Sequence, residues 1–158
     1  MIYGDICINS AKTCAVTGNR YIEKPFNGNL LKETFLNIIA LGYDTILIGM
    51  SVGFDTECFH ALEKIRIEKN IRIIACIPCE NQAEKFTENQ KTEYNRMISV
   101  ADGKIYTGKE YTPKCMQIRN VFMVDNCSLL LAYMKKEKGG TVNTVNYAKR
   151  KKVRISYF

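Results

Sequence analysis

Short apolar runs alternate with longer amphipathic segments along the whole chain. Each run is brief and dominated by aliphatic residues, which favours a buried strand. We expect strands at residues 12–16, 44–49, 71–77, 105–106, 128–133 and 153–155. The run at 71–77 is apolar apart from Arg72, as expected for a strand that is covered on both faces.

Between the runs, apolar residues recur at helical spacing. Leu31, Phe35 and Ile38 form one such stripe, and Gly42 provides a stop for that helix. A second stripe consists of Phe54, Cys58, Ala61, Leu62 and Ile65. His60 falls off this stripe, so we interpret it as a surface histidine rather than a catalytic one.

The remaining segments complete the alternation. Residues 79–101 are polar and helix-prone, Ile118 and Phe122 belong to a further helix, and a last helix ends near Lys149. Strands separated by helices imply right-handed crossovers and a doubly wound, mainly parallel sheet. The sequence therefore predicts an α/β fold: a single Rossmann-like domain, residues 1–158 with a core of roughly 12–156, and helices on both faces of the sheet.

Composition agrees with a globular domain and changes the picture little. The chain is 46% hydrophobic and 25% charged, and no apolar run approaches the ~20 residues of a membrane span. Residues 1–10 lack the basic start and long apolar stretch of a signal peptide. We therefore expect a cytoplasmic protein without a membrane partner, and the apolar content allows a homodimer.

The formal net charge of +7 permits binding to phosphorylated ligands or polyanions. Its densest cluster, residues 149–152, lies at the expected end of the last helix, where cations complement the helix dipole. A solvated helix end is therefore favoured over a dedicated nucleic-acid patch.

Seven cysteines are present, and Cys76 and Cys79 have a C-x-x-C spacing that can mark a redox pair or half a zinc site. Cys76 lies inside an expected strand, Pro78 interrupts the pair, and His60 is the single histidine. Free thiols in a reducing compartment are the favoured interpretation. We expect neither a metal site nor a bound cofactor.

Three glycine-bearing segments each follow an expected strand, at residues 17–20, 49–55 and 139–144. In a parallel sheet such junctions gather at the carboxyl edge, where ligands bind. Glycine lets the backbone approach a ligand closely, and free N–H groups at helix starts attract anions. The pattern predicts a composite site for a phosphate-bearing or nucleotide-like molecule.

The first two segments also have a plainer structural interpretation. The first carries one glycine rather than G-x-G-x-x-G, which disfavours a standard NAD dehydrogenase; Arg20 is either a phosphate-binding fork or an exposed turn residue. Asp55 falls in the first turn of a helix, where it caps the helix or binds a ribose hydroxyl. Gly139, Gly140 and Thr141 open the last helix and form a plausible phosphate cradle.

Taken together, these motifs resemble the YpsA-like branch of the SLOG superfamily. That branch shows T-G-H-R, G-M-x-x-G-x-D, I-P-x-E-N-Q, R-N-x-x-M-V-D-x-S and G-G-T-x-N-T in this order. The corresponding segments here are residues 17–20, 49–55, 77–82, 119–128 and 139–144. The resemblance covers roughly residues 13–155, with Asn19 where the branch usually has histidine.

The resemblance implies a Rossmann-like sheet with a pocket for nucleotides or nucleotide-derived molecules. Related cytokinin-activating phosphoribohydrolases cleave an N-glycosidic bond, and the DNA-processing protein A group binds single-stranded DNA. The hydrolases carry a glutamate where Thr144 stands here, which argues against the same mechanism. Glu80 is an alternative acid or a structural residue of its loop. Arg119 and Asn120 would engage phosphate and a base edge or ribose.

These observations favour a protein that binds or senses a nucleotide or nucleotide derivative. The alternatives are a nucleotide-processing hydrolase that uses Glu80 or Asp55 with a bound water, and a single-stranded nucleic-acid binder. The predicted ligand-binding residues are Thr17, Gly18, Asn19, Arg20, Gly49, Met50, Gly53, Asp55, Pro78, Glu80, Arg119, Asn120, Gly139, Gly140, Thr141, Asn143 and Thr144.

Overall fold

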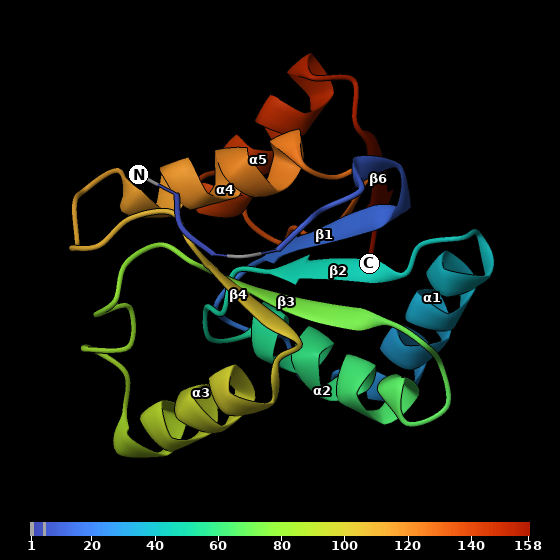
Figure 1. Cartoon of the computed structure of the whole chain (residues 1–158), viewed down its shortest axis with the longest axis horizontal. Helices are drawn as coiled ribbons and strands as arrows, with labels where there is room; N and C mark the ends of the chain where they lie inside the picture. Colours follow the sequence, from blue (N-terminus) through green and yellow to red (C-terminus); the bar gives the residue numbers. More distant parts are fainter. Residues whose placement is uncertain (1, 5) are drawn as a thin grey trace.

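The apolar runs pair side by side as one parallel sheet, because their side chains can then be buried on both faces. The strands are β1 (Thr13–Gly18), β2 (Thr45–Ile48), β3 (Arg72–Ile77), β4 (Gly103–Tyr106), β5 (Leu129–Tyr133) and β6 (Arg154–Tyr157). In this computed structural model, which describes residues 2–4 and 6–158, their order is β4-β3-β2-β1-β5-β6 and all pairs are parallel (Figure 1). Strand order reverses between β1 and β5, which is where ligands bind in open sheets of this kind.

Helices cover the two faces of the sheet unequally. One face is covered by α1 (Gly28–Ala40), α2 (Phe54–Arg66) and α3 (Glu88–Val100), and the other by α4 (Cys115–Asp125) and α5 (Gly140–Arg150) (Figure 1). A short 3-10 turn, Ser10–Lys12, precedes β1. Within the described residues, no helix has the length and apolar character needed to cross a bilayer.

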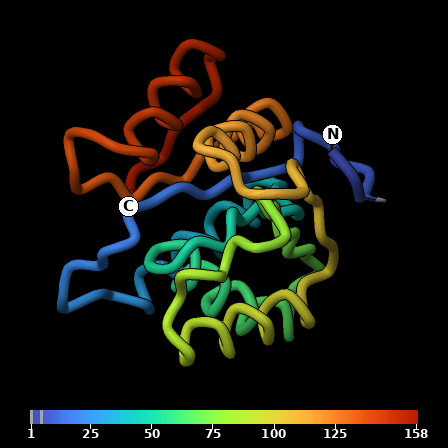
Figure 2. Tube along the Cα trace, turned by 90° about the vertical axis from the view of Figure 1, so that its left-hand side faces the viewer, coloured from blue at the N-terminus to red at the C-terminus, as the bar shows by residue number. Residues whose placement is uncertain are grey.

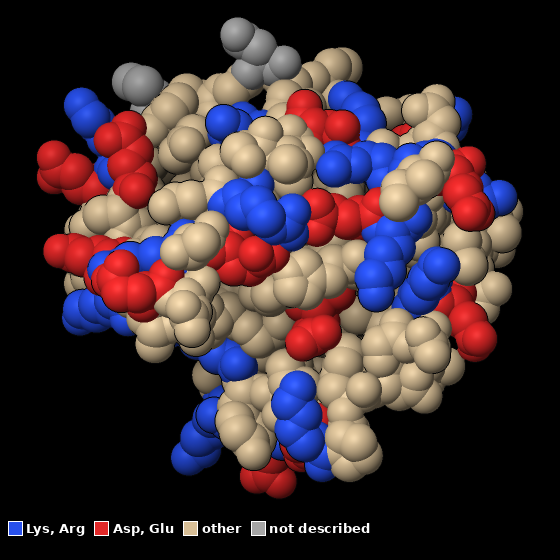
Figure 3. All heavy atoms as spheres, turned by 90° about the horizontal axis from the view of Figure 1, so that it is seen from below, with Lys and Arg blue, Asp and Glu red and all other residues tan. Residues whose placement is uncertain are grey.

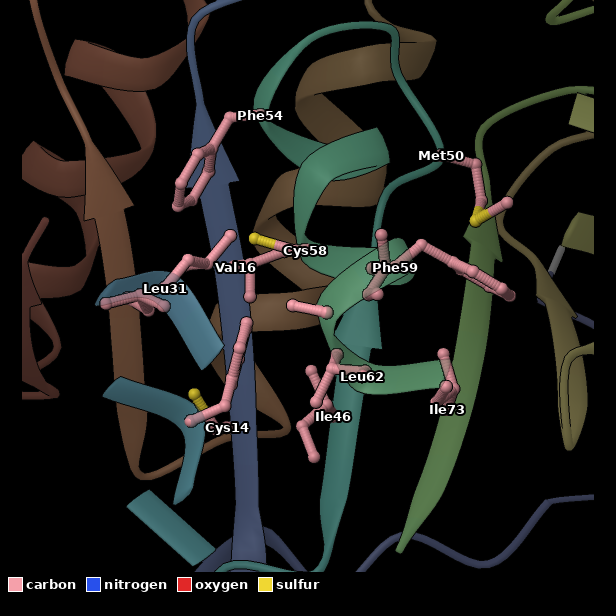
Figure 4. Packing of buried hydrophobic residues seen from close by; sticks show 14 of the residues in the cluster. Cys14, Val16, Leu31, Ile46, Met50, Phe54, Cys58, Phe59, Leu62 and Ile73 are labelled. Atoms are coloured by element: carbon pink, nitrogen blue, oxygen red, sulfur yellow. The ribbon is translucent and has the colours of Figure 1, made fainter. Parts of the chain in front are cut away.

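Side-chain alternation along the strands divides the core into two layers. Cys14 and Val16 of β1 pack toward α1 and α2, whereas Ala15 between them packs toward α4 and α5. Figure 4 shows the first layer, in which Phe54 at the start of α2 lies against β1 and Phe59 points toward β3. The start of α2 is thus fixed directly beneath the carboxyl end of β1.

The predicted fold class is confirmed, most strand boundaries differ by one or two residues, and two of the boundary differences have a clear physical cause. Residues 79–87 form turns, and α3 begins only at Glu88, because Thr87 and Gln90 form a reciprocal capping box there. The last strand covers 154–157 rather than 153–155. The N–H of Val153 donates to the carbonyl of Ala148 in α5 at 3.0 Å, so this residue stays with the helix end.

The C-terminus packs against the segment that follows β1. Figure 2 shows the two segments side by side, and the Phe158 ring lies 5.6 Å from that of Phe26 and 5.9 Å from that of Phe54 between ring centroids. Phe54 also stacks on Tyr133 at 5.1 Å. This aromatic cluster holds the ends of β1 and β5 and the start of α2 together.

We predict that Gly18→Ala destabilises the protein. A Cβ at residue 18 would lie 2.5 Å from the Cβ and Cδ1 atoms of Phe54, which is itself held in the aromatic cluster. Overpacking of this kind costs about 1–3 kcal/mol of unfolding free energy, measurable by urea denaturation.

The matched control is Gly28→Ala at the start of α1, where an added Cβ meets no heavy atom within 4 Å. This variant should be as stable as the wild type or slightly more stable, because alanine favours a helix over glycine. Equal midpoints for Gly18→Ala and Gly28→Ala would contradict the proposed contact.

Candidate functional site

A pocket of about 310 Å³ opens at the carboxyl edge of the sheet, where strand order reverses; we call it the edge pocket. Its lining comes from the loops that follow β1, β2 and β5 and from the end of β1 itself. The starts of α2 and α5 and the first half of α4 complete it. Among the predicted site residues, the ones that line it are Thr17, Gly18, Asn19, Arg20, Gly49, Asp55, Arg119, Asn120, Gly139, Gly140 and Thr141. All three glycine-bearing segments therefore meet in one place.

Asn19 ties the parts of this edge together. Its Oδ1 accepts a hydrogen bond from the N–H of Lys135 at 2.7 Å, and its Nδ2 lies 3.4 Å from Oγ1 of Thr141. The backbone N–H of Asn19 donates to Tyr133 and its carbonyl accepts from Phe54. The neutral amide at this position thus joins the loops after β1 and β5 to the first turns of α2 and α5.

The loop from Gly49 to Asp55 turns sharply between β2 and α2. Met50 has a φ of 61° and Gly53 a φ of 88°, both in the left-handed region. A Cβ at residue 53 would collide with the backbone of Arg20, so the two loops can approach this closely only with glycine there. The loop after β1 consequently lies directly against the loop after β2.

Arg119 lines the edge pocket and also joins neighbouring elements to one another. Its side chain is buried (4% exposed), and Nη1 donates to the carbonyl oxygens of Gly49 and, at 3.3 Å, Cys76. Nε donates to Oδ1 of Asn120 at 2.8 Å. Much of the donor capacity of Arg119 is used to hold β2, β3 and α4 together, although its charge still contributes to the pocket it lines.

Asp55 lies on the floor of the edge pocket and is 6% exposed. The backbone N–H of Ser51 donates to its Oδ2 at 3.0 Å, so the carboxylate ties the loop after β2 to the first turn of α2. Burial raises the pKa of Asp55 to about 6, an effect that the positive charge of Arg119 opposes. Asp55 is thus an acid that titrates close to neutral pH.

The start of α5 forms the opposite wall. Gly139 precedes the helix with a φ of 119° and offers no side chain to cap it, and the first turn contains no acidic residue. The first N–H groups of a helix lack intrahelical acceptors, and together with the helix dipole they attract an anion. Thr141 lies beside them, and the exposed Lys136 and Lys138 line the same pocket.

The other predicted residues lie outside the lining of the edge pocket. They are Met50, Gly53, Pro78, Glu80, Asn143 and Thr144. Glu80 is exposed and accepts a hydrogen bond from the hydroxyl of Tyr3 at 2.9 Å, and the hydroxyl of Thr144 donates to the carbonyl of Gly140 at 2.8 Å. Asn143 is exposed on the second turn of α5, and the side chain of Met50, in the loop after β2, is buried.

Sequence reasoning missed several residues of the lining, namely Val16, Ser51, Met116, Lys136 and Lys138. The two lysines lie within three residues before Gly139. Lysines at this place, just before a glycine-rich helix start, could have been predicted from the sequence to line a phosphate site. Among the described residues, no group of three or more histidine, cysteine, aspartate or glutamate side chains is arranged to hold a metal ion. Cys76 and Cys79 are both buried free thiols.

We predict that Asp55 makes the stability of the fold depend on pH. Its pKa in the folded protein, about 6, exceeds the ordinary value of 3.8, so the folded state binds the proton more tightly than the unfolded chain does. This contribution to stability is fully present below about pH 4 and is lost as the pH rises through 6, by at most about 3 kcal/mol.

Asp55→Asn removes the titrating group, so this variant is the reference against which the wild type is compared. Between pH 4 and pH 7 the unfolding free energy of the wild type should fall relative to that of Asp55→Asn. A constant difference across this range would contradict a raised pKa for Asp55.

Two known structures have the same arrangement of strands and helices. DNA processing protein A from Streptococcus pneumoniae matches with a TM-score of 0.71 at 17% identity, over 93% of this chain and 50% of that one. The protein of the same name from Helicobacter pylori, whose single-stranded DNA binding mode has been described, matches with a TM-score of 0.69 at 17% identity, over 94% and 65%. The chain thus spans one half to about two thirds of these proteins, and the likeness concerns the fold.

Sequence comparison identifies closer relatives. The SPbeta prophage-derived protein YoqJ of Bacillus subtilis (strain 168) is 32% identical over 119 residues, which are 66% of this chain and 68% of YoqJ. A UPF0398 protein of Bacillus thuringiensis (strain Al Hakam) is 25% identical over 164 residues, covering 93% of this chain and 89% of the relative. The family model for YpsA, described as the YspA SLOG family, matches residues 22–157. The chain therefore belongs to the YpsA family of SLOG proteins.

Proposed function

We propose that this protein binds a nucleotide or nucleotide-derived ligand, with the phosphate and sugar of that ligand in the edge pocket. One observation carries the proposal: the uncapped start of α5 and three exposed basic side chains, those of Arg20, Lys136 and Lys138, line the same pocket. Helix N–H groups and cations are the donors that a phosphate requires.

The volume of the edge pocket supports a small ligand. At about 310 Å³ it lies at the lower end of the range of ligand sites, about 300–1,000 Å³. That is room for a sugar phosphate but not for a whole dinucleotide. The start of α5, Lys136 and Lys138 lie on the α5 side, whereas Asp55 lies on the α2 side near Arg20, where a sugar hydroxyl can donate to it.

Binding or sensing is favoured over hydrolysis by the acids present. Among the described residues lining the edge pocket, Asp55 is the single carboxylate. Glu80, the other candidate acid, bonds to Tyr3 outside the lining, and Thr144 stands where the related hydrolases carry a glutamate. If the protein does hydrolyse a nucleotide, Asp55 is the residue placed to act as acid or base, since its pKa of about 6 suits that role.

We predict that Gly140→Val weakens the binding of a nucleoside monophosphate at least tenfold while the protein stays folded. An added Cβ at residue 140 meets no heavy atom within 4 Å, so the first side-chain carbon fits, and the two methyl groups beyond it narrow the phosphate cradle. Titration calorimetry with AMP and with ribose 5-phosphate measures the effect.

Gly28→Val is the matched control, because Gly28 also begins a helix and also has open space around its Cβ position. It lies outside the lining of the edge pocket and should leave affinity unchanged. Full affinity in a folded Gly140→Val variant would refute the cradle.

A second candidate function, binding of single-stranded DNA, is favoured by the lysines at residues 135, 136 and 138 near the mouth of the edge pocket and by the fold shared with DNA processing protein A. Our proposal predicts that fluorescence anisotropy finds weak oligothymidylate binding that disappears as salt increases, because binding through phosphate contacts alone is driven by counterion release and weakens steeply with salt. Tight oligonucleotide binding that excludes AMP competitively would favour the second function instead.

A further inference from the structure

A second pocket, of about 280 Å³, lies between the start of α2 and α3; we call it the α2–α3 pocket. The loop after β2 separates it from the edge pocket and contributes to both. Gly49 lines the edge pocket, Met50 and Val52 line the α2–α3 pocket, and Ser51 lines the two together. The two cavities are therefore neighbours that share one wall.

The α2–α3 pocket is lined by acidic and aromatic side chains, whereas the charged side chains of the edge pocket are mainly basic. Phe86 and Tyr94 form an edge-to-face pair there, with ring centroids 5.7 Å apart, above the buried Met97. Its charged lining residues among those described are Glu57 and Glu93, and no lysine or arginine lines it. Such a site repels phosphate and accepts a flat, largely apolar group that carries hydrogen-bond donors.

The polar groups of the α2–α3 pocket are not equally free. Glu93 is engaged by Arg96 and His60, both at 2.7 Å, and these hydrogen bonds lower the pKa of Glu93 to about 2. Gln90 is committed to the capping box of α3. Glu57, in the first turn of α2, makes no side-chain hydrogen bond or ion pair with the described residues and is half-buried.

A buried chain of hydrogen bonds fixes the two pockets relative to each other. The hydroxyl of Tyr94 donates to Oε1 of Gln82 at 3.1 Å, and Nε2 of Gln82 donates to the carbonyl of Gly49 at 2.9 Å. Arg119 donates to that same carbonyl from the side of the edge pocket. One carbonyl thus anchors a wall of each cavity, so the same buried cluster sets the positions of the two cavities relative to each other.

We propose that the α2–α3 pocket holds the nucleobase of the ligand, with Phe86 packing against the base and Glu57 accepting hydrogen bonds from an amino-bearing base edge. This inference rests on the proposed function, which places the phosphate in the edge pocket. Adenine, guanine and cytosine present an exocyclic amine to a carboxylate, whereas uracil presents two carbonyl oxygens. The α2–α3 pocket therefore selects amino-bearing bases.

The face of the molecule on the side of α2 and α3 carries charges of both signs (Figure 1 and Figure 3). On the face of the molecule seen in Figure 3, basic and acidic side chains are interspersed rather than separated into single-sign patches. Arg96 of α3 pairs with Glu63 of α2 and Glu93 of α3, both at 2.7 Å. Electrostatic attraction for the phosphate is thus left to the edge pocket, and the α2–α3 pocket adds contacts to the base.

The test is titration calorimetry of the wild type and variants with AMP, CMP, UMP and ribose 5-phosphate. Wild-type protein should bind AMP and CMP about tenfold or more tighter than ribose 5-phosphate, and tighter than UMP. Phe86→Leu should bring the affinity for AMP close to that for ribose 5-phosphate, because it keeps apolar volume but removes the stacking face. Glu57→Gln should reduce the preference for AMP and CMP over UMP.

Ribose 5-phosphate separates this inference from the function on which it rests. Its affinity should be the same in the wild type, Phe86→Leu and Glu57→Gln, and the exposed Glu88→Gln variant of α3 should bind every probe as the wild type does. Equal affinity of the wild type for AMP, UMP and ribose 5-phosphate would overturn the base assignment and leave the edge pocket intact. Failure of all four probes to bind would overturn both.

Discussion

The carbonyl of Gly49 and the two side chains that donate to it, Arg119 and Gln82, are the interaction on which the site depends. Arg119 comes from α4, on one face of the sheet, and Gln82 from the turns before α3, on the other. A buried guanidinium is costly to desolvate, and a buried polar group left without its hydrogen-bond partner costs about 1–3 kcal/mol. The end of β2 is thereby fixed from both faces, and the loop that follows it becomes a rigid partition between two cavities.

The charged groups that line the two cavities differ in sign. The edge pocket combines an uncapped helix start with exposed lysine and arginine side chains and one buried acid, Asp55, of raised pKa. The α2–α3 pocket has aromatic and carboxylate groups. A nucleotide has the same division between an anionic phosphate and a flat base with donor edges. The proposed ligand therefore matches the linings of both pockets, whereas a phosphate or a base alone would match one.

The fold and most of the edge pocket could be predicted from the sequence, because both depend on local patterns. Apolar runs identify strands, and the glycine segments at residues 17–20, 49–55 and 139–144 mark the carboxyl ends of three of them. The role of Arg119 could not be read in this way, since its acceptors at Gly49 and Cys76 become neighbours only when β2 and β3 pair. Glu80 follows β3, which is two strands away from β1 in the sheet. Its position after a strand therefore did not bring it into the lining of the edge pocket.

The central claim, that a nucleotide phosphate binds between the loop after β1 and the start of α5, is tested most directly by NMR. Titration of ¹⁵N-labelled protein with AMP reports on each backbone N–H separately. The account predicts saturable shifts concentrated at Gly18, Gly139, Gly140 and Thr141, which line the edge pocket. Shifts confined to the basic end of α5 at residues 149–152, or no saturable shift at all, would contradict it.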